Sequence, residues 1–91
     1  MYKTMSGYNS VELSRIAFEN EADIPLSVKC GCYCCCRIFD ANLIGEDDWC
    51  DDANARTALC PLCGIDTVLP DSKVELSVEL LRWMHREWFS D

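Results

Sequence analysis

The chain has 91 residues and a formal net charge of −8, from 16 acidic and 8 basic residues. A chain of this length is expected to form a single domain, residues 1–91, whose small core stabilises it only modestly. The basic residues are scattered, and no stretch has the roughly 18 consecutive apolar residues of a membrane span. We therefore expect neither direct nucleic-acid binding nor insertion into a membrane.

Eight cysteines offer the two devices that most often stabilise small domains, disulfides and a bound metal. Residues 1–15 contain neither the apolar run nor the cleavage pattern of a secretory signal peptide. We therefore expect a cytoplasmic protein with reduced thiols, in which a metal takes the place of disulfides.

The N-terminal third predicts one short helix and one short strand. Residues 1–9 carry little apolar periodicity and are expected to form either a flexible arm or a segment that a partner orders. Ser10 is expected to cap a helix over residues 11–19, since serine is a favoured N-cap. Any helix must end before Pro25, and residues 26–29 are then typical of a short strand that leads into the cysteines.

The middle of the chain predicts a helical turn and a second strand. Asp40 is expected to cap the turn, with Leu43, Ile44 and Trp49 packed beneath it. Residues 65–69 have the β-branched character of a strand, which stops at the turn dipeptide Pro70-Asp71.

The C-terminal segment gives the clearest helix signal. Ser77 is expected to cap a helix over residues 78–89. Leu80, Met84 and Trp88 recur every four residues and so share one face. Leu81 and Phe89 widen that face, and we expect the whole stripe, Trp88 included, to belong to the core.

Paired cysteines supply the main chemical signal. Zinc prefers four soft ligands in a tetrahedron, and a Cys-x-x-Cys turn brings two sulfurs onto one ion. Cys60-Pro-Leu-Cys63 is such a pair, and Gly64 allows the backbone to fold over it. In the crowded run over residues 30–36, only Cys32 and Cys35 have two intervening residues. These spacings predict one zinc ion per chain, bound by Cys32, Cys35, Cys60 and Cys63.

Four cysteines fall outside this set, namely Cys30, Cys34, Cys36 and Cys50. Free cysteines are among the most buried residues, so we expect these four to fill space in the fold. A second metal site or a redox switch is the alternative interpretation.

Several segments together resemble a group of small uncharacterised bacterial cytoplasmic proteins. The resemblance rests on the cysteine run from Cys32, on Trp49 followed by acidic residues, on residues 58–66 (Ala-Leu-Cys-Pro-Leu-Cys-Gly-Ile-Asp), and on the aromatic ending 81–89. It covers about the last two-thirds of the chain and implies the same four cysteines, whereas Cys34 and Cys36 depart from the pattern. It implies no activity.

These features together predict a small α+β fold. A zinc-ribbon-like core of short strands is expected over residues 28–70, with the C-terminal helix over 77–89 and one or two further short helices.

Catalysis is not expected. A thiolate nucleophile needs a base nearby, and His85 is the only histidine in the chain. A hydrolytic metal needs an open coordination position, whereas four thiolates would fill all four. We expect a zinc-stabilised protein-interaction module that acts as a stoichiometric inhibitor, such as an immunity protein or a phage anti-defence protein.

The expected partner is a protein with a basic, nucleic-acid-handling surface. Its candidate binding residues form the acidic run around a potential aromatic anchor: Glu46, Asp47, Asp48, Trp49, Asp51 and Asp52. Three alternatives stay open, namely a zinc ribbon associated with transcription or nucleic acid, a single-iron electron carrier, and a thiol-redox protein.

Overall fold

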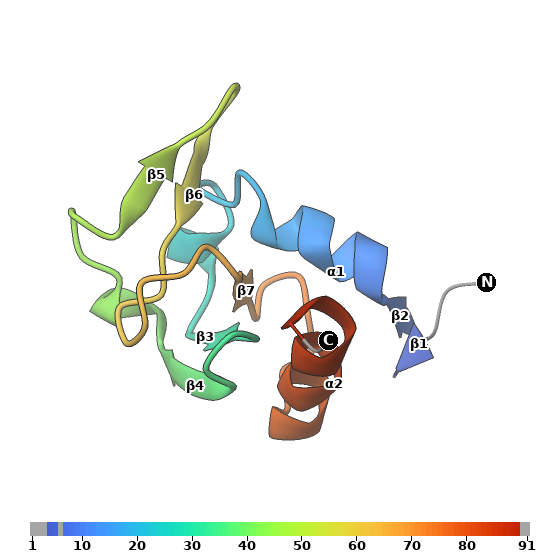
Figure 1. Ribbon diagram of the computed structural model, residues 1–91. Helices are drawn as coiled ribbons and strands as arrows, with labels where there is room; N and C mark the ends of the chain where they lie inside the picture. The colour runs from blue at the N-terminus through green and yellow to red at the C-terminus, as the bar shows by residue number, and fades with distance from the viewer. Residues whose placement is uncertain (1–3, 6, 90–91) are drawn as a thin grey trace.

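The computed structural model describes residues 4–5 and 7–89, and it confirms the α+β class (Figure 1). The described elements are, in chain order, β1 (Thr4–Met5), β2 (Tyr8–Asn9), α1 (Ser10–Ala17), the 3-10 helix η1 (Ile24–Leu26), β3 (Lys29–Cys32), β4 (Arg37–Asp40), the 3-10 helix η2 (Ala41–Leu43), β5 (Trp49–Asp51), β6 (Arg56–Ala58), β7 (Val68–Pro70) and α2 (Val78–Phe89). None of the helices in this part of the chain is long and apolar enough to cross a membrane.

A three-stranded antiparallel sheet, in the order β4-β3-β7, forms the centre of the molecule. Side chains alternate between the two faces of a sheet, and the register pairs Gly31 with Leu69 and Cys32 with Val68. Leu69 therefore points to one face while Cys32 and Val68 point to the other, and each face carries its own hydrophobic cluster.

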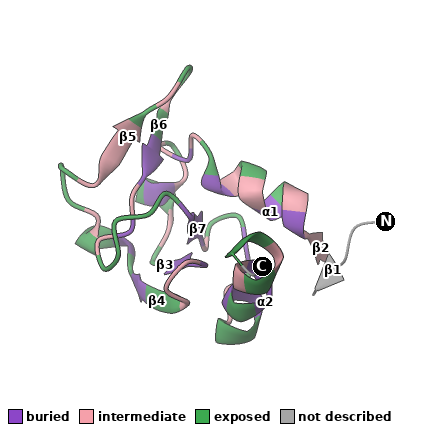
Figure 2. Ribbon diagram, viewed as in Figure 1, coloured by how far each residue is buried: buried purple, intermediate pink, exposed green. Residues whose placement is uncertain are grey.

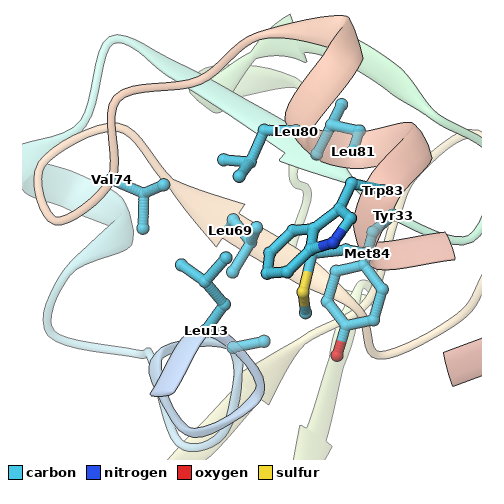
Figure 3. Close-up of a cluster of buried hydrophobic side chains, with 9 residues drawn as sticks. Leu13, Tyr33, Leu69, Val74, Leu80, Leu81, Trp83 and Met84 are labelled. Atoms are coloured by element: carbon cyan, nitrogen blue, oxygen red, sulfur yellow. The ribbon is translucent and has the colours of Figure 1, made fainter. Parts of the chain in front are cut away.

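Helices α1 and α2 cover one face of the sheet (Figures 1 and 3). The cluster between them consists of Leu13, Ala17, Tyr33, Leu69, Val74, Leu80, Leu81, Trp83 and Met84. Gly31 is required beneath α2, because a Cβ atom at this position would lie only 3.1 Å from both methyl carbons of Leu81. The glycine thus lets the helix approach the strand that carries the first cysteines.

The opposite face carries the smaller cluster and the β5-β6 hairpin. This cluster consists of Ile24, Cys30, Cys32, Phe39, Ala41, Ala58, Cys60 and Val68. The colouring in Figure 2 shows that β6 is largely buried where it meets the body, whereas β5 is half-buried. Two of the predicted zinc ligands therefore belong to the core of this face.

Asn20 links the hairpin to the sheet. Its side chain donates a hydrogen bond of 2.9 Å to the carbonyl oxygen of Val68 and accepts one of 2.9 Å from the backbone N–H of Ala58. Only 1% of this residue is exposed. Since both partners are backbone groups, the buried amide bridges β6 and β7 in the way that a backbone amide links neighbouring strands of a sheet.

The N-terminal helix differs from its prediction in cap and extent. Asn9, not Ser10, is the N-cap, and its side-chain oxygen accepts a hydrogen bond of 2.8 Å from the N–H of Glu12. Ser10 is buried in the first turn, and the helix ends at Ala17. Asparagine caps as well as serine, so the local sequence did not distinguish the two positions.

The predicted strands begin too early. Leu26 belongs to η1 and Val28 precedes β3, so the first strand starts at Lys29 and continues through Cys32. The second strand starts at Val68 rather than at residue 65. Within the predicted arm, β1 pairs with β2, whereas residues 1–3 and 6 lie outside the described residues.

The C-terminal helix has the predicted extent but a different buried face. The Ser77 hydroxyl accepts a hydrogen bond of 3.0 Å from the N–H of Leu80, which confirms the cap. Trp88 and Phe89 are 49% and 41% exposed, so the prediction that they belong to the core is wrong. Trp83, which the four-residue spacing left out, is buried instead. All buried residues of α2 lie between Leu80 and Met84, so the last turn of the helix packs less closely than its middle.

Candidate metal centre

The four cysteines selected by spacing lie together. One sulfur from each of Cys32, Cys35, Cys60 and Cys63 lies within 4.8 Å of every other, and the group could hold a metal ion. Close approaches join the two pairs: Cys32 Sγ lies 3.6 Å from Cys63 Sγ, and Cys35 Sγ lies 3.8 Å from Cys60 Sγ.

These distances suit a tetrahedral metal site. Metal–sulfur bonds of about 2.3 Å in a tetrahedron place the sulfurs about 3.8 Å apart, whereas a disulfide needs about 2.05 Å. All four cysteines are free thiols. The arrangement therefore has the spacing of a four-thiolate metal centre.

Two turns of the same construction present the sulfurs. In the first, the N–H of Cys36 donates a hydrogen bond of 2.8 Å to the carbonyl oxygen of Cys32. In the second, Gly64 makes the same 2.8 Å bond to Cys60. Cys36 and Gly64 both have positive φ, 59° and 82°, because the chain turns back at this point. Cys36 thus occupies a position that favours glycine.

Backbone amides point at the sulfurs in both turns. The N–H of Cys34 lies 3.4 Å from Cys32 Sγ, and the N–H of Leu62 lies 3.4 Å from Cys60 Sγ. Amide–sulfur hydrogen bonds stabilise thiolates, so both turns are prepared for negatively charged ligands.

The metal-free thiols differ in their proton affinity. Burial raises the pKa of Cys60 to about 12 and that of Cys35 to about 11. Burial also acts to raise the pKa of Cys63, but hydrogen bonds from the Ile65 backbone and from the neighbouring thiols outweigh it and lower this pKa. Cys35 and Cys60 are therefore protonated at neutral pH, and a metal ion must displace their protons when it binds.

Thr67 is a residue of this centre that the spacing argument missed. Its Oγ1 lies 3.3 Å from Cys32 Sγ, and the residue is 7% exposed. A hydroxyl that donates to a thiolate sulfur stabilises its charge and orients it. The sequence carries no signal for this role, because threonine is also common in strands for its shape alone.

We expect Thr67→Val to weaken metal binding, because valine keeps the shape but removes the donor to Cys32. The affinity for zinc, measured by competition with a chromophoric chelator, should fall on the order of tenfold. Thr67→Ser keeps the hydroxyl and is the matched control. Equal affinities for the valine and serine variants would show that the hydroxyl does not act on the metal.

Three of the remaining cysteines have other surroundings, and the fourth, Cys34, lies beside the four-thiol group. Cys30 lies in the core, where burial and then the charge of Asp71 raise its pKa to about 12. Cys36 directs its sulfur toward the carbonyl oxygen of Leu81, 3.8 Å away, and Cys50 lies next to the carbonyl oxygen of Asp51 at 3.9 Å. Cys34 is half-buried. Among the described residues only one group of cysteine, histidine and acidic side chains has metal-binding spacing.

His85 is not part of the candidate metal group. Its Nδ1 is 3.1 Å from the carbonyl oxygen of Tyr33, and its ring stacks on Phe89 with centroids 5.2 Å apart. The structure therefore gives the histidine a packing role.

The acidic run divides into exposed and structural residues. Glu46, Asp47 and Asp51 are exposed. Asp48 accepts a hydrogen bond of 2.8 Å from the N–H of Gly45, and Asp52 accepts one from the hydroxyl of Thr57. These two carboxylates therefore help to shape the loop and the hairpin.

Trp49 is half-buried and is covered on one side. It packs against the smaller cluster, and the guanidinium carbon of Arg56 lies 4.8 Å from the centroid of its ring. Arg56 is held in turn by Glu21, with 2.7 Å between Nε and Oε2. The Trp49 side chain is therefore only partly accessible to a partner protein.

The fold and the cysteine geometry define a small α+β protein with a four-thiol candidate metal centre and a zinc-ribbon-like core. Comparison with protein-family models, with curated proteins and with solved structures finds no match for the chain.

Proposed function

We propose that this protein is a zinc-stabilised, non-enzymatic interaction module that inhibits a basic, nucleic-acid-handling protein by occupying its surface. The observation that carries the proposal is a set of exposed carboxylates around the second cysteine turn and the neighbouring hairpin. We call this set, Glu46, Asp47, Asp51 and Asp66, the acidic surface.

Electrostatics at Cys50 group two members of the acidic surface, Asp51 and Asp66. Burial raises the pKa of this thiol, and the carboxylates of Asp52, Asp66 and Asp51 raise it further. Asp66, which follows the second cysteine turn, therefore lies within electrostatic reach of Cys50 on β5. Four thiolates around one zinc ion would add a further net charge of about −2 beside it. A basic protein surface is the complement of such a field.

The metal centre supports a binding role over catalysis. Four thiolates complete the tetrahedron of a zinc ion and leave no position for substrate or activated water. Zinc would then act by joining the two cysteine turns, which hold the acidic residues in place. The proposed activity is stoichiometric, in the manner of an immunity or anti-defence protein.

The test uses the zinc-loaded protein as bait, followed by binding kinetics on the protein it captures. The affinity should fall steeply with added salt. Glu46→Lys/Asp47→Lys should slow association by roughly tenfold or more, because charges at the edge of an interface act mainly on encounter. Asp48 is left unchanged, since its carboxylate holds the N–H of Gly45.

The matched control is Glu75→Lys/Glu79→Lys, which changes the net charge equally at exposed positions near and within α2. This variant should associate nearly as fast as the original protein. Salt-independent binding, or equal slowing by both double variants, would rule out the acidic surface as the contact.

A single-iron centre is the second candidate, and the amide–sulfur hydrogen bonds in both turns are the feature that favours it. Elemental analysis of the purified protein separates the two, and an iron-loaded protein would be coloured. One iron atom per chain in the purified protein would favour an electron carrier over the proposed interaction module.

A further inference from the structure

We propose that a groove between η1 and η2 receives an apolar side chain from the partner, and that Lys or Arg residues flanking this side chain meet the start of the acidic surface. The proposal deepens the proposed function and rests on it for the basic character of the partner. The partner segment is thus an apolar anchor within a basic stretch.

The groove is a pocket of about 270 Å³, and its lining includes Ile24, Pro25, Ala41, Asn42, Ile44 and Trp49. This is smaller than the roughly 300–1,000 Å³ of sites for small molecules, so it suits one or two side chains. The 3-10 helices contact each other, and the N–H of Ala41 bonds to the carbonyl oxygen of Val28 at 3.0 Å. The two walls are therefore fixed relative to each other.

The most exposed large apolar side chains belong to the same chain segments as the lining of the groove. Val28 is 75% exposed, Leu26 is 74% exposed and Leu43 is 53% exposed, the highest values among the large hydrophobic residues described. All three are sequence neighbours of lining residues. Exposed apolar residues gathered around a concave site are typical of a protein-binding surface.

Charge indicates which kind of partner fits. Glu46 and Asp47 are exposed and follow Ile44 by two and three residues, on the loop that leads to Trp49. Arg56, which lies over the Trp49 ring, is paired with Glu21, and Lys29, which follows Val28, is paired with Asp40. The rim on the side of the loop is therefore acidic, and it complements lysine or arginine residues that flank an apolar anchor.

The experiment titrates ¹⁵N-labelled, zinc-loaded protein with a synthetic helical peptide that carries leucines at i and i+4 among lysines. Chemical-shift changes should concentrate on residues 24–28 and 41–49, including the indole N–H of Trp49. A peptide of equal charge, with serines in place of the leucines, should bind at least tenfold more weakly.

The Leu26→Ser/Leu43→Ser variant should lose on the order of tenfold in affinity for the leucine peptide. Phe18→Ser, which changes a side chain that is 52% exposed and outside the lining of the groove, should lose none. Both protein variants should fold, because the replaced side chains are more than half exposed.

Equal binding of both peptides would rule out the groove as the site for an apolar side chain, but it would be consistent with binding at the acidic surface. Tight, leucine-dependent binding whose affinity does not change with salt concentration would support the groove as a binding site. It would count against the proposed function, which requires a basic partner. Absence of binding, shifts located elsewhere, or self-association of the protein through the groove would each overturn the inference.

Discussion

Replacing Cys60 with serine is expected to abolish both metal binding and the folded state. Cys60 is 1% exposed, belongs to the core of the cysteine face, and lies 3.8 Å from Cys35. Structural zinc contributes an apparent 10–16 kcal/mol or so in small zinc domains, which is as large as the whole net stability of most domains. Elemental analysis should give no zinc, and circular dichroism should show lost structure.

Cys50→Ser is the matched control for this substitution. Cys50 is half-buried on β5, and the only hydrogen bond described for its sulfur is with the neighbouring Asp51 carbonyl. The variant should retain one zinc ion per chain and nearly full stability. A folded, zinc-bound Cys60→Ser protein, or equal damage from both substitutions, would contradict the assignment of the ligands.

Trp83→Ala is expected to lower the free energy of unfolding by about 3–5 kcal/mol, the usual cost of removing a buried tryptophan. Trp83 is 9% exposed and packs between the two helices and the sheet (Figure 3). Urea denaturation of the zinc-loaded protein measures the effect.

Trp88→Ala provides the comparison within the same helix. This ring is 49% exposed, and its Nε1 donates a hydrogen bond of 3.3 Å to the carbonyl oxygen of Ser10. Loss of that bond and of partial burial should cost about 1–2 kcal/mol. Equal losses for the two tryptophans would mean that the last turn of α2 is as well packed as its centre.

Local signals in the sequence predicted the parts of the molecule that depend on local chemistry. The cap at Ser77 and the extent of α2 follow from one hydroxyl and a regular periodicity. The two Cys-x-x-Cys pairs follow from the geometry of a tight turn, and the structure brings these four sulfurs together. Each of these signals lies within a few neighbouring residues.

Contacts between segments that are far apart in the chain could not be predicted from the sequence. The β5-β6 hairpin was not predicted because its acidic residues disfavour strands, and it is held by Asn20 and by Glu21, more than 30 residues away. The choice of Trp83 over Trp88 depends on which part of α2 packs against the rest of the fold. Thr67 became visible only when its hydroxyl was placed beside Cys32.

The pairing of Cys35 with Cys60 has a consequence for how the chain can vary in length. A metal at this point would be a cross-link that closes residues 36–59 into a ring. The entropy of closing a ring changes slowly with its size, by about 0.6 kcal/mol for each doubling. Insertions at the exposed loop around Glu46 and Asp47 would therefore cost the metal centre little. The segment that carries the charge can be lengthened or reshaped while the cross-link stays the same.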